Sequence, residues 1–156
     1  MNVLKIIGIL LINLVCAATG AYYALKTKDR CETARQLIQM ADMMSVELSF
    51  SADNSRKIIN RLRKEKSLSK LGFLNDIDLE NIDIKTGLDP ADDEKVNMLF
   101  RNLGSTDVSS MLKIINSFKE SISASLKGYT EYSRSHSRLF VAFGILGGLA
   151  VSIVLI

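Results

Sequence analysis

Side chains of the kinds that catalyse reactions are scarce in this sequence. His136 is the only histidine, and Cys16 and Cys31 are the only cysteines. One histidine and two distant cysteines do not make a zinc site, which takes four protein ligands or three with a bound water. Serines are numerous but no second histidine-like base accompanies them, and no glycine-rich loop leads to a lysine as in phosphate-binding loops. The sequence therefore predicts a protein that is not an enzyme and uses no cofactor or metal.

Charged residues are more informative, because they form two consecutive blocks of opposite sign. The basic block, residues 56–70, has seven cations against Glu65, and the acidic block, residues 76–94, has eight anions against Lys85. The blocks are either solvated faces that neutralise each other within one domain, or patches that bind a charged partner or a second copy of the chain. The candidate partner-binding residues are Arg56, Arg61, Arg63 and Lys64.

Anionic lipid and nucleic acid are two alternative ligands for the basic block. Anionic lipid headgroups attract basic residues close to a membrane surface by about 1 kcal/mol each. Nucleic acid is not expected, because no aromatic platform or recognition motif accompanies the basic run.

Both ends of the chain are almost free of charge. All charged residues except Lys5 lie between Lys26 and Arg138. The 20 uncharged residues 6–25 and the 18 uncharged residues 139–156 would form helices of about 30 and 27 Å, close to the roughly 30 Å of a bilayer core. We therefore expect transmembrane helices in 1–25 and 139–156. A signal peptide is the alternative for the first, although its apolar run exceeds the usual h-region of about 7–15 residues.

Small residues in both end segments predict helix packing within the membrane. Gly144 and Gly148 form a GxxxG pair, and Gly20 belongs to a stripe with Ala17, Ala21 and Ala24. Small residues let two helix backbones approach closely in lipid. The alternative is that glycine and alanine are simply tolerated there.

Basic residues near the two segments predict the orientation. Seven of them flank the segments on the side of the middle domain: Lys26, Lys28, Arg30, Arg35, Lys127, Arg134 and Arg138. The other side offers only Lys5 and the amino terminus. Since basic residues stay on the cytosolic side, we expect residues 26–138 to be cytosolic.

The periodicity of the middle segment is helical. Residues 31–50 have the pattern of an amphipathic helix that can continue from the first span, and a second helix carries Ile58, Ile59 and Leu62 and reaches about Lys66. Residues 67–88 are irregular, and their structure, including a short strand, stays open.

Two further helices are expected after the irregular stretch. Asp89-Pro90 predicts the start of a helix that runs to Leu103 and stops at Gly104, and Ser105 or Thr106 would cap the next. From Val108 onward apolar residues recur without a proline, so a helix of about 50 residues, or 75 Å, can run into the membrane. The predicted fold is all-α, a helical bundle over 26–138 flanked by the two transmembrane helices.

Specific segments of the sequence resemble a known family. The turn Leu103-Gly104-Ser105-Thr106-Asp107 and the closing segment Arg138-Leu139 with Phe143-Gly144-Ile145-Leu146-Gly147-Gly148-Leu149 resemble signatures of stage III sporulation protein AB of endospore-forming bacteria. Gly20, Arg30, Leu37 and Glu47-Leu48 match it more loosely.

The resemblance implies a membrane-anchored scaffold in a sporulation-specific, secretion-like channel, similar to the inner-membrane platform proteins of type II secretion and type IV pilus systems. It implies a place in the mother-cell membrane around the forespore. The implied partners are the cytosolic ATPase stage III sporulation protein AA, other channel components and, as an open alternative, further copies of the chain. The competing hypothesis is a small regulatory two-span membrane protein without an ATPase partner.

Overall fold

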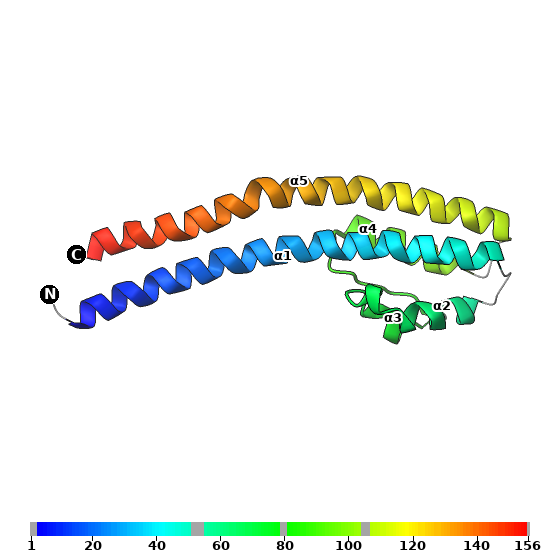
Figure 1. Cartoon of the computed structure of the whole chain (residues 1–156), viewed down its shortest axis with the longest axis horizontal. Coiled ribbons are helices and arrows are strands. Elements are labelled where there is room, and N and C mark those ends of the chain that lie inside the picture. The colour runs from blue at the N-terminus through cyan, green and yellow to red at the C-terminus, as the bar shows by residue number, and fades with distance from the viewer. Residues whose placement is uncertain (1–2, 51–54, 79–80, 104–106, 156) are drawn as a thin grey trace. The chain divides into compact units, whose positions relative to one another are not determined.

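The computed structural model describes residues 3–50, 55–78, 81–103 and 107–155, and within 3–24 and 136–155 it describes only some of the side chains. The regular elements in the described ranges are all helices, and these ranges contain no strand, which confirms the all-α prediction. The elements in chain order are α1 (Val3–Phe50), α2 (Ser55–Lys64), the 3₁₀ helix η1 (Lys66–Leu68), α3 (Phe73–Asp76), α4 (Pro90–Asn102) and α5 (Val108–Leu155) (Figure 1).

Two very long helices contain most of the chain. α1 and α5 have 48 residues each, so the predicted continuation of the 31–50 helix and the long last helix from Val108 are both confirmed. The chain divides into two compact units, one made of Met1–Asp29 and Tyr129–Ile156 and the other of Arg30–Gly128. Each long helix therefore contributes residues to both units.

The predicted membrane segments belong to the first unit. Among the residues that the structure describes, none of the helices combines the length and apolar character needed for a membrane crossing. Most side chains of 6–25 and 139–156 lie outside that description, as do the surroundings of Gly144 and Gly148, whereas Gly20 is buried.

The core of the second unit forms where α1, α2, α4 and α5 turn their apolar faces inward. Its largest fully buried side chains include Leu37, Met40 and Met44 from α1, Leu99 and Phe100 from α4, and Met111, Ile115 and Ile122 from α5. The predicted helical stripes thus supply the core, and burial of such side chains is the main stabilising contribution.

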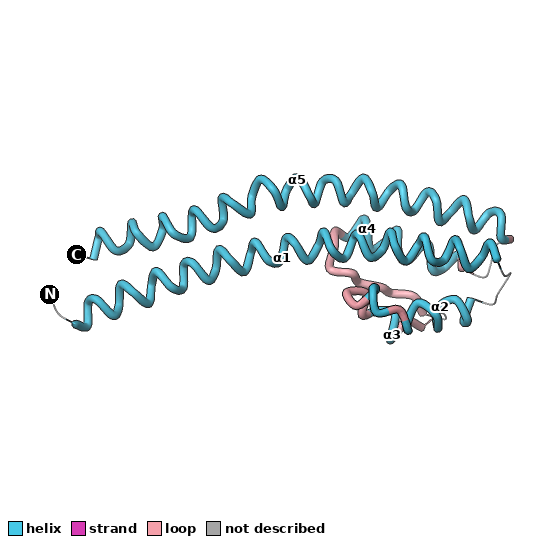
Figure 2. The backbone as a smooth tube through the Cα atoms, in the orientation of Figure 1, coloured by secondary structure: helices cyan, strands magenta, loops and turns pink. Residues whose placement is uncertain are grey.

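The segment from α2 through η1 to Lys70 runs antiparallel to α1, as three contacts show. Arg61 pairs with Glu47, the Gln39 amide donates to the Ser67 hydroxyl at 2.8 Å, and the Lys70 N–H donates to the Gln36 side chain at 2.8 Å. Residue numbers rise on one partner as they fall on the other, and Figure 2 shows α2 returning along α1.

The stretch between α2 and α4 is as irregular as the sequence predicts. It contains only η1 and the single turn of α3, and the described part of 77–89 is neither helix nor strand. Ile84 and Leu88 are nevertheless buried. Gly87 has a φ of 80°, a backbone conformation that glycine adopts without steric cost.

The start of α4 is confirmed in position, with one difference. Asp89 is the N-cap residue and Pro90 opens the helix, but the Asp89 side chain makes no capping hydrogen bond. It faces Arg30 of α1 instead, at 3.4 Å. α4 ends at Asn102, while Gly104, the predicted helix stop, lies outside the described residues.

The predicted cap of α5 is wrong. Ser105 and Thr106 lie outside the described residues, and the capping residue is Asp107, whose carboxylate accepts hydrogen bonds from the Ser109 hydroxyl and, at 3.1 Å, from the Ser110 N–H. These hydrogen bonds, led by that of Ser109, hold the pKa of Asp107 well below its usual range. Aspartate is preferred here because its oxygen satisfies a helix N–H that has no intrahelical acceptor.

Candidate partner-binding surface

The short helix α2 exposes a basic face. Ile58, Ile59 and Leu62 are buried, and side chains about half a turn away point outward. The exposed residues on that outward face are Arg56, Lys57, Asn60 and Lys64. Two of the four predicted partner-binding residues, Arg56 and Lys64, are therefore brought together on one outward face.

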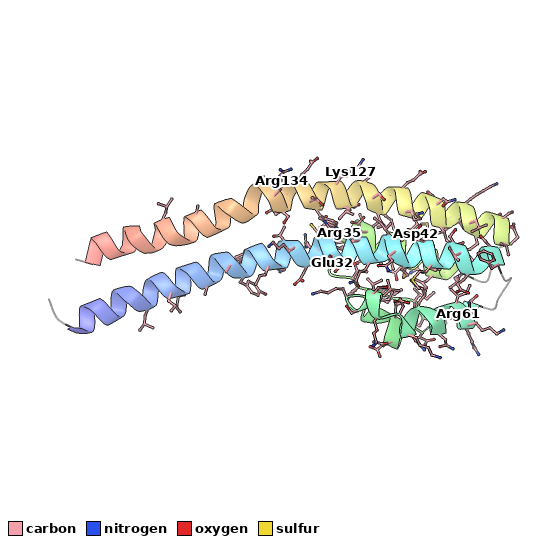
Figure 3. All side chains as sticks on the ribbon, in the orientation of Figure 1. Glu32, Arg35, Asp42, Arg61, Lys127 and Arg134 are labelled. Atoms are coloured by element: carbon pink, nitrogen blue, oxygen red, sulfur yellow. The ribbon has the colours of Figure 1, made fainter. Side chains whose placement is uncertain are left out.

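Arg61 lies at one edge of this face, next to α1. Its guanidinium forms an ion pair with Glu47, whose side chain is about three-quarters buried. Figure 3 shows Arg61 on α2. The pair joins α2 to α1, so Arg61 helps to position the helix, although more than half of its own side chain stays exposed.

Arg63 lies at the opposite edge and binds main-chain carbonyls of the following segment. Its Nε donates to the carbonyl of Leu74 at 2.6 Å, and its NH2 group to that of Ile77 at 3.4 Å. These two acceptors lie within α3 and directly after it. Because an α-helix leaves its last carbonyls without intrahelical donors, Arg63 satisfies the end of α3.

An exposed apolar pair lies on α1 beside the edge that Arg61 occupies. Val46 is 53% exposed and Phe50 is 88% exposed. Residues four apart on a helix are neighbours on its surface, and Glu47, the partner of Arg61, lies between them in sequence. The sequence periodicity did not single out either residue, because both fall outside the buried stripe of α1.

The acidic block is not one uniform surface. Asp92 is buried, with its side chain 4% exposed, and its carboxylate accepts from Lys95 and from the Ser125 hydroxyl of α5, both at 2.8 Å. Asp93 accepts from the N–H and the hydroxyl of Thr86. Asp92 lies four residues before the buried Val96, on the apolar face of α4. This spacing was the feature of the sequence that could have predicted the burial of Asp92.

Four ion pairs in the described part of the chain join a residue of one block to a residue outside the opposite block. Arg61 pairs with Glu47, Asp92 with Lys95, Asp89 with Arg30 and Glu94 with Arg101. None of these four contacts neutralises one block with the other. In the described part of the acidic block, the acidic side chains that are exposed are Asp76, Asp78, Asp83, Asp89 and Glu94.

Asn97 is a structurally important residue that the sequence reasoning missed. It is buried on α4, where its amide oxygen accepts from the Ile84 N–H at 2.7 Å and its amide nitrogen donates to the Ile84 carbonyl at 3.2 Å. The position of Asn97 directly after the buried Val96 was the feature of the sequence that could have pointed to its role. Asn97 fixes the irregular segment to α4, and with it the exposed carboxylate of Asp83.

The residue types that could bind metal do not converge in the part of the chain that the structure describes. No group of three or more histidine, cysteine, aspartate or glutamate side chains there is arranged to hold a metal ion. Cys31 is a buried free thiol. The candidate site that the described residues offer is the exposed basic face of α2.

Comparison with known proteins supports the resemblance seen in the sequence. The family model of stage III sporulation protein AB matches residues 5–77 and 76–156. No curated protein and no solved structure matches the chain. Because the two matched segments together span almost the whole sequence, the chain belongs to the stage III sporulation protein AB family and is a sporulation protein.

Proposed function

We propose that this protein is a non-catalytic scaffold, anchored in the mother-cell membrane around the forespore, which presents a cytosolic helical unit to the ATPase stage III sporulation protein AA within a secretion-like complex. The anchor would be the uncharged segments 6–25 and 139–156, and the presented unit would be Arg30–Gly128. Gly20, Gly144 and Gly148 would let the two anchoring helices pack closely.

Continuity of the helices supports this proposal. α1 and α5 each lead from an uncharged segment into the packed core of the second unit without a break. Both connections between the uncharged segments and the second unit are therefore helical rather than linkers of irregular structure. A scaffold that is anchored at both ends of its chain is compatible with this arrangement.

The observation that carries the docking proposal is the outward face of α2. Arg56, Lys57 and Lys64 are exposed together, while Arg61 and Arg63 at its edges hold the helix to α1 and α3. Because these contacts hold α2 in place, the helix itself need not be ordered on binding. Its exposed cations would steer an acidic partner toward this face. The partner is therefore expected to offer an acidic surface.

Titration of the full-length, detergent-solubilised chain with the ATPase from the same organism tests this proposal. The double variant Arg56→Glu/Lys64→Glu should weaken binding, mainly by slowing association, and the difference from wild type should shrink at high salt. Lys113→Glu, an exposed lysine of α5, is the matched control and should bind as wild type. Absence of binding by the wild-type chain would refute ATPase docking and favour the small regulatory protein without such a partner.

A further inference from the structure

Phe50 is the most exposed of the large apolar side chains that the structure describes, at 88%. Single exposed apolar residues are ordinary on protein surfaces. Phe50, however, has Val46 one turn before it on the same side of α1, itself 53% exposed. Together they form an apolar strip at the carboxyl end of the helix.

Cations of α2 lie beside this strip. The Glu47–Arg61 ion pair fixes α2 against α1 at the level between Val46 and Phe50. Lys57 lies one turn before Arg61 on α2. Because the segment from α2 to Lys70 runs antiparallel to α1, Lys57 lies nearer than Arg61 to the Phe50 end of α1. Lys57 and Arg61 are both exposed and share one side of α2. The apolar strip on α1 and the cationic strip on α2 are thus adjacent.

We propose that Val46, Phe50, Lys57 and Arg61, here called the Phe50 patch, form the anchor of the docking surface, with Phe50 entering an apolar pocket on an acidic protein surface. This inference rests on the proposed function, in which that surface belongs to the ATPase. It adds an apolar anchor to an interaction that the outward face of α2 would otherwise make by charge alone.

The composition of the patch matches what binding surfaces use for affinity. Energetically dominant interface residues are enriched in aromatic and arginine side chains, surrounded by contacts that exclude water. Exposed charges chiefly raise the association rate, whereas a buried anchor slows dissociation. The two parts of the surface therefore have separable effects: Arg56 and Lys64 act on association, and Phe50 acts on dissociation.

Binding kinetics of the full-length chain with the purified ATPase distinguish these effects. Phe50→Ala should raise the dissociation rate and weaken affinity about tenfold or more, with an association rate close to wild type. Val46→Ala should show a smaller loss. Met98→Ala is the matched control, because Met98 of α4 is 55% exposed, nearly as much as Val46. The Met98→Ala variant should bind the ATPase with the affinity of wild type.

Each other outcome is informative. If Arg56→Glu/Lys64→Glu weakens binding and Phe50→Ala does not, Phe50 is not the anchor of the docking surface, while the proposed function stands. If the wild-type chain does not bind the ATPase, both fail. If Phe50→Ala leaves ATPase binding intact but dissociates a homo-oligomer on light-scattering analysis, the strip contacts a second copy and the inference is overturned. An unchanged circular dichroism spectrum and melting temperature of Phe50→Ala would show that a loss of binding is not a loss of fold.

Discussion

Asn97 of α4 pairs with the backbone of Ile84 as a neighbouring strand would, accepting from its N–H at 2.7 Å and donating to its carbonyl at 3.2 Å. Both groups of Ile84 are buried by this contact. A buried N–H or carbonyl that has lost its partner is costly. One side chain thereby replaces the strand partner that the irregular segment does not have.

Removing this amide should destabilise the second unit. Asn97→Ala leaves the N–H and the carbonyl of Ile84 without their partner, at about 1–3 kcal/mol for each group, so we expect unfolding to become about 2–6 kcal/mol more favourable. Chemical denaturation of the full-length chain measures the change. Asn116→Ala, at an exposed position of α5, is the control and should lie within about 0.5 kcal/mol of wild type.

Two carboxylates with lysine partners should differ strongly in their contribution to stability. Asp92 is buried against Lys95 and Ser125, whereas Asp42 of α1 pairs with Lys119 of α5 and has 54% of its side chain exposed. Asp92→Ala should cost about 1–3 kcal/mol, because it removes the buried carboxylate that accepts from both Lys95 and Ser125. Asp42→Ala should cost no more than about 1 kcal/mol. If Asp92→Ala and Asp42→Ala lower the free energy of unfolding equally in chemical denaturation, the burial of Asp92 does not determine its contribution to stability.

The four arginine and lysine residues predicted to bind a partner should separate into two classes. Arg63→Ala removes the donors to the carbonyls of Leu74 and Ile77 and should lower stability by about 1–2 kcal/mol. Arg56→Ala and Lys64→Ala, on the outward face of α2, should leave stability within about 0.5 kcal/mol of wild type. Stability that is insensitive to Arg63→Ala would return Arg63 to the set of candidate binding residues.

The cap of α5 should make part of the stability depend on pH. The pKa of Asp107 is lowered in the folded protein by hydrogen bonds from Ser109 and Ser110. Its charged form therefore stabilises the fold above the ordinary aspartate pKa of about 3.9, and this contribution is lost as the pH falls below that value. Asp107→Asn keeps a capping oxygen without the charge. The advantage of wild type over Asp107→Asn in melting temperature should shrink between pH 6 and pH 3, and a constant difference would contradict the assignment.

Orientation in the membrane can be measured by cysteine labelling. In a background of Cys16→Ala and Cys31→Ala, the chain can be expressed in vegetative cells, whose plasma membrane has its non-cytosolic side toward the medium. A cysteine placed after Ile156 should then react with an impermeant maleimide in intact protoplasts. Asn116→Cys, in the proposed cytosolic unit, should react only after permeabilisation. This expectation follows from the seven basic residues that flank the uncharged segments. The reverse labelling pattern would refute both the orientation and docking to a cytosolic ATPase.

Helix positions could be predicted from the sequence because they depend on local patterns. The apolar spacing in 31–50 and after Val108, and the Asp89-Pro90 start, gave helices that the structure confirms. Periodicity also identified the buried face of α2, with Ile58, Ile59 and Leu62. These features require only that neighbouring residues share one helix face. The family could likewise be identified from sequence segments alone.

The roles of individual polar residues were decided only by the tertiary structure. Arg63 and Lys64 are adjacent and both basic, yet Arg63 binds the carbonyls that follow α2, and Lys64 faces outward. Asp92 and Glu94 belong to one acidic run, yet Asp92 is buried against α5 and Glu94 is exposed. A hydrogen bond depends on which distant group the packing brings within about 3 Å. Residue type and spacing along the chain do not contain that information, so the sequence determined the helices and the fold determined which charged side chains are exposed and which are buried.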